Sequence, residues 1–308
     1  MPQGSVLGPL YFIIFINDMP EAVHNLIALF ADDAKLFSSI ASTQHHDELQ
    51  EDLESLQDWA NKWQLRFNAK KCKVMHLGRS NPEYEYKMGD VVLESVDDEK
   101  DLGVRIDNEL KFDLHIESQV NKANRILGLI RRSFDILETD TFNILYKSLV
   151  RPYLEYCNAV TYPQYQRQCK LLEGVQRRAT KMVPHLREKG YTDRLEELDL
   201  PSLYFRRARG DIIETYKYIH NIYKVNSSPL IRDTNTDRTR GHSLKLETRR
   251  HNKVLRKHFF SYRVITPWNK LPEEIVHAPT VNTLKNRLDK HWRKHKYSLE
   301  NFTSSFPR

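Results

Sequence analysis

Cysteine is scarce in this sequence. The 308 residues include only three cysteines, Cys72, Cys157 and Cys169. An odd number of widely spaced cysteines argues against a disulfide scaffold and favours a reducing compartment. No spacing of cysteine and histidine matches a zinc site either.

Long apolar runs are also absent. The most apolar segment extends from Val6 to Ile16 and contains Gly8 and Pro9. It is much shorter than the ~20 residues that a membrane-spanning helix needs, and no basic leader precedes it. We therefore expect an intracellular protein, nuclear or cytoplasmic, that neither crosses a membrane nor is secreted.

The charges are unevenly divided along the chain. Hydrophobic residues make up 40% and charged residues 29%, which favours a folded globular protein. Residues 1–110 contain 10 Lys and Arg against 20 Asp and Glu, net −10, whereas residues 111–308 contain 38 against 21, net +17. The second part could follow a phosphate backbone, although a surface that only aids solubility is the simpler alternative.

Residues 1–110 are predicted to mix strands and helices. Pro9 suits a first helical turn, so Gly8–Ile16 is predicted to be a short helix. Apolar runs at Ile27–Phe30 and Ala34–Phe37 flank an Asp-Asp turn and predict a β-hairpin. Apolar residues at steps of three and four predict a long helix over Thr43–Gln64. Further strands are predicted at Leu65–Asn68, Val74–Leu77 and Leu102–Ile106, with a second hairpin over Tyr84–Leu93.

After Leu110 the periodicity is helical. Helical stripes of apolar residues begin at Phe112, Phe142, Leu171, Leu203 and Leu284, and Pro152 is expected to end the second. Residues 226–256 are polar and show no period, which predicts a loop or mobile arm. The fold class is therefore α+β, with a mixed first part and a mostly helical second part.

Asp32 and Asp33 form an acidic pair at the predicted hairpin tip, between apolar runs. Neighbouring carboxylates in an apolar setting repel each other and resist desolvation, so a cation is expected between them. Asp32 would be the principal ligand of Mg²⁺, or of Mn²⁺, and Asp33 a weaker or indirect one. The alternative is an ordinary turn without an ion.

Gln3, Gly4 and Ser5 precede the first predicted helix. Glycine allows backbone to approach a ligand closely, and the two polar side chains offer hydrogen bonds to a sugar, base or phosphate. The alternative is a turn that merely leads into the helix.

These segments together resemble a known family. Pro2–Pro20 and Leu29–Phe37 resemble the consecutive B and C motifs of reverse transcriptases from non-LTR retrotransposons, LINE elements of the jockey and chicken-repeat type. Trp59–Gly78 is similar to the helix, basic turn and primer grip that follow in that family. The segments Leu102–Val104, Arg151–Tyr156 and Trp268–Pro272 resemble its thumb and C-terminal extension.

The resemblance implies an RNA-directed DNA polymerase that uses an RNA template, a DNA primer and deoxynucleotide triphosphates. Residues 1–110 would be a truncated palm with motifs B to E, residues 111–225 a helical thumb-like region, and residues 226–308 a basic loop and helical extension. Asp32 and Asp33 match the metal-binding pair, and Gln3, Gly4 and Ser5 lie on the nucleotide and template side. Lys71 matches the basic residue near the triphosphate, with Lys70 as its rival.

The family's fingers and its A motif, which completes the metal site with a further Asp, should precede Pro2. We therefore expect this chain alone to be inactive, because losing one carboxylate strand removes several orders of magnitude in rate. The alternative function is a noncatalytic basic module that binds nucleic acid. A metal-dependent nuclease using the same Asp pair ranks last.

Overall fold

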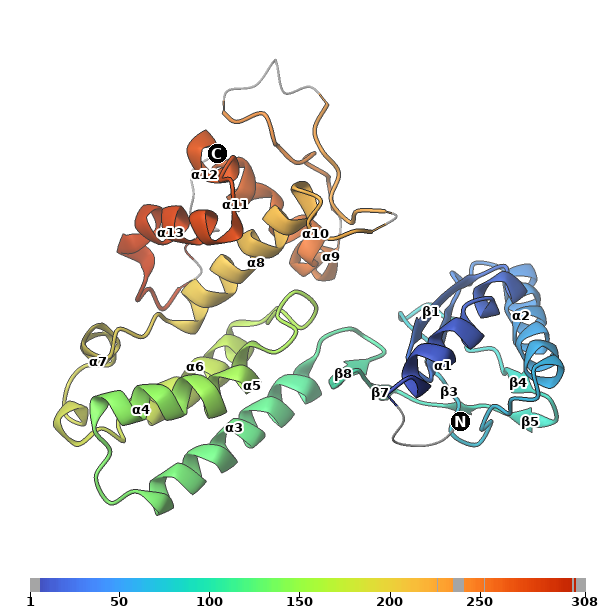
Figure 1. Cartoon of the computed structure of the whole chain (residues 1–308), viewed down its shortest axis with the longest axis horizontal. Coiled ribbons are helices and arrows are strands. Elements are labelled where there is room, and N and C mark those ends of the chain that lie inside the picture. The colour runs from blue at the N-terminus through green and yellow to red at the C-terminus, as the bar shows by residue number, and fades with distance from the viewer. Residues whose placement is uncertain (1–5, 226, 235–240, 252, 301, 303–308) are drawn as a thin grey trace. The chain divides into compact units, whose positions relative to one another are not determined.

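The computed structural model describes residues 6–225, 227–234, 241–251, 253–300 and 302 (Figure 1). The chain divides into two compact units. An N-terminal unit comprises Met1–Lys100 and Ile106–Leu110, and a helical unit comprises Asp101–Arg105 and Lys111–Arg308. The hairpin of β7 (Asp98–Asp101) and β8 (Val104–Asp107) contributes residues to both.

The N-terminal unit combines helices with pairs of short strands. Strands β1 and β2 pair antiparallel, as do β4 and β5, whereas β3 and β6 pair parallel. Its elements are α1 (Gly8–Ile16), η1 (Met19–Ala22), β1 (Leu26–Phe30), β2 (Asp33–Phe37), α2 (Thr43–Lys62), β3 (Lys73–Val74), β4 (Lys87–Met88), β5 (Val91–Val92) and β6 (Glu94–Ser95).

The core of this unit lies between α1, α2 and the β1–β2 hairpin. Helix α2 buries Leu56, Trp59 and Ala60, as its apolar stripe predicts, against Ile16 and Met19. Helix α1 is apolar around its whole circumference, so burying one side leaves hydrocarbon on the other. Its outward residues are between 52% and 63% exposed: Leu10, Tyr11, Ile13 and Ile14.

The predicted strand at Leu65–Asn68 is wrong, because the end of α2 uses these backbone groups. Gln64 has a φ of 56°, and the Leu65 N–H donates to the Ala60 carbonyl at 2.8 Å, which closes the helix. Leu65 and Phe67 still pack into the core. The predicted strand over Leu102–Ile106 begins only at Val104, since Leu102 and Gly103 form the left-handed turn of the hairpin.

The helical unit contains the remaining helices. Helices α3, α6, α8 and α13 confirm four of the predicted apolar stripes. The elements are α3 (Asp113–Ser133), α4 (Thr139–Leu145), the π-helical turn η2 (Tyr146–Val150), α5 (Arg151–Glu155), α6 (Gln166–Thr180), η3 (Pro184–Leu186), α7 (Tyr191–Glu197), α8 (Leu203–Ile219), α9 (Val254–His258), α10 (Phe260–Arg263), α11 (Ile265–Asn269), α12 (Glu273–Val276), α13 (Val281–His291) and η5 (Arg293–His295).

Pro152 does not end the second predicted helix. Helix α4 passes through the π-helical turn η2 into α5, whose first turn contains Pro152. Proline is tolerated in a first turn because its missing N–H would have no partner there. The helical path therefore continues to Glu155.

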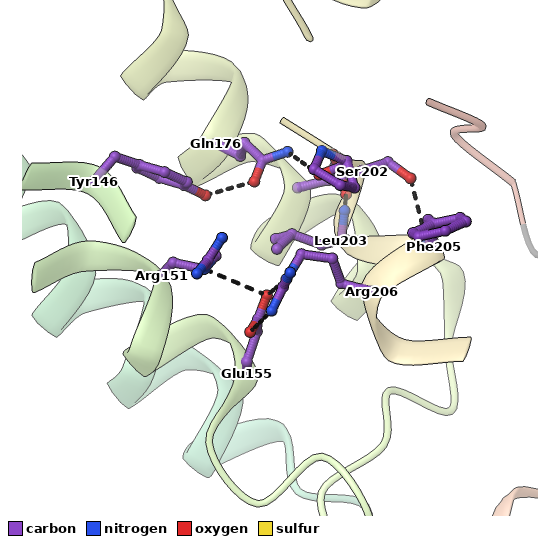
Figure 2. Close-up of polar contacts among 10 residues, drawn as sticks. Tyr146, Arg151, Glu155, Gln176, Ser202, Leu203, Phe205 and Arg206 are labelled. Carbon is purple, nitrogen blue, oxygen red and sulfur yellow. Dashed lines mark hydrogen bonds and ion pairs between the residues drawn. The ribbon is translucent and has the colours of Figure 1, made fainter. Parts of the chain in front are cut away.

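Two hydrophobic cores hold this unit together. One lies among α3, α4, α6 and the start of α8, and the other among α8, α11, α12 and α13. Buried polar contacts reinforce the first: the Tyr146 hydroxyl donates to Gln176 at 2.6 Å, and the Gln176 amide donates to the Pro201 carbonyl at 3.1 Å. Figure 2 shows Tyr146 and Gln176 facing each other from η2 and α6.

The polar segment between α8 and α9 is a loop, as predicted, but it ends before residue 256 because α9 begins at Val254. Its described residues form no helix or strand, only a bridge between Arg232 and Leu246. The Asn269 amide group donates to and accepts from the Leu246 backbone at 2.8 Å each, and the Trp268 indole donates to the Leu244 carbonyl at 2.7 Å. These hydrogen bonds connect the loop to α11, and the alternative of a mobile arm stays a prediction.

The α+β fold class is confirmed.

All three cysteines are free thiols, and burial raises the pKa of each. Among the residues that the structure describes, no helix has both the length and the apolarity to traverse a lipid bilayer.

Candidate active site

The acidic pair lies at the tip of the β1–β2 hairpin. The last cross-strand pair joins Phe30 to Asp33, so the loop consists of Ala31 and Asp32 alone. Ala31 has a φ of 52°, in the left-handed region that non-glycine residues seldom adopt. This strained two-residue loop brings Asp32 and Asp33 to the apex of the hairpin.

Both carboxylates are exposed, and neither has a hydrogen bond or ion pair with any residue that the structure describes. The inference that desolvation would demand a cation between Asp32 and Asp33 was therefore wrong. Leu29 and Leu36 of the hairpin are partly buried against the core, whereas the tip of the hairpin is exposed. Exposure leaves the carboxylate oxygens free to bind a ligand.

Asp52 anchors the base of the hairpin. This residue of α2 is fully buried, and its two carboxylate oxygens accept from the His24 N–H at 2.7 Å, the Asn25 N–H at 2.8 Å and the Asn25 side chain at 2.9 Å. These donors directly precede β1. Asp52 therefore fixes where the strand leading to the acidic pair begins.

The apolar periodicity that predicts α2 does not by itself single out Asp52. A better signal was available, because Asp52 occupies the apolar stripe formed with Leu49 and Leu56. A carboxylate in that stripe is buried, and a buried carboxylate needs donors. A second anchor is similar: the Trp59 indole donates to Asp18 at 3.1 Å, linking α2 to the end of α1.

Lys71 lies in a tight turn that the Asn68 carbonyl organises. This oxygen accepts from the Lys71 N–H at 2.8 Å and from the Cys72 N–H at 3.2 Å. The side chains of Lys70 and Lys71 are exposed, and neither has a partner among the described residues. Local geometry alone does not distinguish the two lysines.

The hairpin and the basic turn belong to one unit. Leu29 and Leu36 of the hairpin pack on the same core as Phe67, and Phe67 also contacts the smaller core that Ala69 and Cys72 cover. The acidic pair and Lys71 are thus held on one framework. Gln3, Gly4 and Ser5 lie outside the described residues.

The acidic pair alone does not make a complete metal site. Nowhere in the described residues do three or more side chains of His, Cys, Asp or Glu gather to hold an ion. Magnesium takes oxygen ligands and commonly combines one or two carboxylates with water and substrate phosphates. Two free, adjacent carboxylates at a loop apex fit such a shared site and would need ligands from elsewhere to complete it.

Comparisons with known proteins converge on one family. Residues 1–130 match the family described as reverse transcriptase (RNA-dependent DNA polymerase). The chain is similar to the RNA-directed DNA polymerase from mobile element jockey of Drosophila funebris, with 35% identity over 173 residues, 51% of this chain and 18% of that protein. The jockey polymerase of Drosophila melanogaster is 32% identical over 174 residues, with the same shares.

A third relative is the probable RNA-directed DNA polymerase from transposon BS of Drosophila melanogaster, 32% identical over 143 residues, 42% of this chain and 16% of that protein. The chain thus matches less than a fifth of the length of these curated relatives. No solved structure matches it. The resemblance inferred from the sequence is confirmed by these findings.

Proposed function

We propose, from the kinship of this chain with the reverse transcriptases of non-LTR mobile elements, that it forms part of an RNA-directed DNA polymerase. The reaction is template-directed nucleotidyl transfer, in which a primer 3′-hydroxyl attacks the α-phosphate of a deoxynucleotide and releases pyrophosphate. The partners are an RNA template, a DNA primer and deoxynucleotide triphosphates. An intracellular location, nuclear or cytoplasmic, follows from this role.

One observation carries the proposal: an exposed, unpartnered acidic pair at a strained hairpin apex lies inside the region that matches reverse transcriptases. Strain of about 1–3 kcal/mol at a loop apex persists where the surrounding structure enforces it, and such strain is common at functional sites. Asp52 and the core beneath the hairpin are the enforcing structure here.

The residues have separate roles. Asp32 and Asp33 would hold Mg²⁺ or Mn²⁺, which neutralises charge on the phosphates when it is bound. Lys71, or Lys70, would place a positive charge beside the triphosphate and the leaving pyrophosphate. Gln3, Gly4 and Ser5 would line the nucleotide and template. A further carboxylate from another strand is expected to complete the site.

A metal-binding measurement tests the acidic pair directly. We expect Mn²⁺ to broaden the NMR signals of the hairpin apex in the wild-type chain, and to lose this effect in Asp32→Asn and Asp33→Asn. Asp90→Asn is the matched control, because Asp90 is an exposed Asp in the two-residue turn between β4 and β5. Equal broadening in all variants would contradict the assignment.

Primer extension on an RNA template with Mg²⁺ tests the chemistry. If the chain extends the primer, Asp32→Asn should abolish extension and Asp90→Asn should not. Because the site is expected to need a further carboxylate, we expect the chain alone to extend the primer slowly or not at all. In that case the same variants are compared after the chain is joined to the preceding region of a jockey polymerase.

The second candidate function is noncatalytic binding of nucleic acid. The net charge of +17 over residues 111–308 favours it, because neutralising phosphates releases counterions and gives affinity without sequence readout. Salt-sensitive binding of RNA, with no extension even in the joined protein, would support this function over the first.

A further inference from the structure

A cavity whose lining includes several buried polar side chains lies within the helical unit. Residues of α3, of α5 and the loop after it, of α6 and of α8 line it. Its enclosed volume is about 20 Å³. Sites for drug-sized molecules usually have about 300–1,000 Å³, so this cavity suits a small ion.

Arg207 of α8 is the unusual member of the lining. Its side chain is 3% exposed, yet Nη1 and Nη2 have no hydrogen-bond partner among the described residues. The guanidinium group lies over the Tyr204 ring, 4.9 Å from the ring centre. Buried guanidinium nitrogens without acceptors are costly, so a missing acceptor is expected.

The neighbouring carboxylates are occupied by other groups. Asp211 accepts from Arg263 at 2.8 Å on both of its oxygens. Glu155, at the rim of the cavity, is paired with Arg206 and approached by Arg151 at 3.9 Å, as Figure 2 shows. Arg207 lies close enough to Asp211 to interact with its charge, but no described carboxylate accepts a hydrogen bond from Arg207 Nη1 or Nη2.

The carboxylate of Glu173 also has hydrogen-bond partners other than Arg207. It is buried, and its oxygens accept from the Tyr191 hydroxyl at 2.6 Å and from the Leu203 N–H at 3.0 Å. Burial raises its pKa, which weakens it further as a counterion for Arg207.

Two further donors line the same cavity. His115 is 3% exposed, and its Nδ1 accepts from the Arg105 N–H at 3.2 Å, so in the neutral ring Nε2 carries the proton. Gln119, one turn later on α3, is 6% exposed, and its amide has no partner among the described residues. The cavity is therefore rich in donors.

We propose that this cavity binds a small oxyanion of the phosphate class, with the Arg207 guanidinium as its principal contact and His115 and Gln119 as further donors. A planar guanidinium presents two parallel N–H groups that match two oxygens of such an anion. The anion would be free phosphate or a phosphate group of a nucleic acid. The inference does not depend on the polymerase assignment.

The test measures the affinity of the full-length chain for inorganic phosphate at constant ionic strength, by isothermal calorimetry and by the rise in melting temperature. Phosphate that binds only the folded chain should raise the melting temperature with concentration. Arg207→Gln should weaken phosphate binding on the order of 10-fold or more. Arg125→Gln, which removes an exposed cation from α3, should bind like the wild type.

Gln119→Leu keeps the test valid if Arg207→Gln fails to fold, because it removes donors without changing charge. It should also weaken phosphate binding. The proposal is overturned if phosphate does not bind the wild-type chain, or if binding survives in the folded variants. In that case ordered water occupies the cavity.

The source of the anion is found with oligothymidylates that carry either a 5′-phosphate or a 5′-hydroxyl. A nucleic-acid source predicts tighter binding of the phosphorylated strand, with the difference lost in Arg207→Gln. Binding of inorganic phosphate with equal affinity for both strands identifies free phosphate as the ligand. Both results support an oxyanion site.

Discussion

Asp52 acts on the candidate active site without belonging to it. Asp52→Ala would leave the His24 N–H, the Asn25 N–H and the Asn25 side chain without their acceptor. We expect the free energy of unfolding to fall by about 2–3 kcal/mol, because partly buried donors would lose a charged acceptor. Urea denaturation measures this change.

The control is Asp58→Ala, an exposed carboxylate on the same helix. It should alter stability by no more than about 0.5 kcal/mol. Equal losses in the two variants would mean that the buried hydrogen bonds of Asp52 do not stabilise the hairpin.

Ala31 stores strain beside the acidic pair. Glycine adopts positive φ freely, so Ala31→Gly should raise the free energy of unfolding by about 1 kcal/mol. Ala34→Gly, in strand β2, should instead lower the free energy of unfolding. Glycine relieves no strain there and only raises the conformational entropy of the unfolded chain. Thermal unfolding compares the two variants, and a loss of stability in Ala31→Gly would disprove the strain.

The acidic pair could be predicted from residue identity, since two Asp between apolar runs indicate a turn in any fold. Its exposure could not be predicted, because tertiary packing decides which side of a hairpin is covered. Arg207 lay in a run of basic residues whose usual interpretation is a solvated helix face. Its burial depends on α3 and the loop after α5, which local sequence does not reveal.

At the scale of elements, Glu173 connects α6 to α7 through Tyr191 and to the first turn of α8 through Leu203. Burial raises the pKa of this carboxyl above its usual value of 4.5. The folded chain therefore holds the proton at pH values where the unfolded chain has lost it. Stability from this group is present below pH 4.5 and is lost as pH rises through the folded pKa.

Glu173→Gln tests this sign. The variant keeps an acceptor oxygen and cannot ionise, so its stability relative to the wild type should improve as pH rises from about 4.5 toward neutrality. Urea denaturation across this range gives the difference, in which the titrations of other groups cancel. A pH-independent difference would show that Glu173 titrates normally.

Element boundaries show what periodicity misses. Long amphipathic helices such as α3 and α8 were predicted because their apolar stripes repeat over several turns. Leu65–Asn68 alternates like a strand, but the backbone of Leu65 closes α2. A proline normally ends a helix, but Pro152 occupies the first turn of α5, directly after a π-helical segment. A backbone hydrogen bond decided the first case, and the position of Pro152 in a first helical turn decided the second.

At the scale of the whole molecule, the acidic and basic parts of the sequence correspond largely to units with separate cores. We expect single-stranded RNA to bind the full chain with an affinity that falls steeply between about 50 and 200 mM salt. The steepness of this fall should increase with the number of phosphates that the chain contacts. Fluorescence anisotropy measures this dependence.

Crosslinking with mass spectrometry then locates the RNA. Crosslinked peptides should come mainly from residues 111–308, where Lys and Arg outnumber Asp and Glu. Crosslinks confined to residues 1–110, or an affinity that does not change with salt concentration, would contradict an electrostatic interface in the helical unit. The division of that unit into thumb-like and extension regions stays a prediction.

The outward residues of α1 govern how the purified chain will behave. Leu10, Tyr11, Ile13 and Ile14 present hydrocarbon to water on one short helix, and such patches promote self-association. Oligomers formed this way would grow with concentration and with added ammonium sulfate. Titrations with phosphate or RNA therefore need light scattering at the same protein concentration, so that self-association is not mistaken for ligand binding.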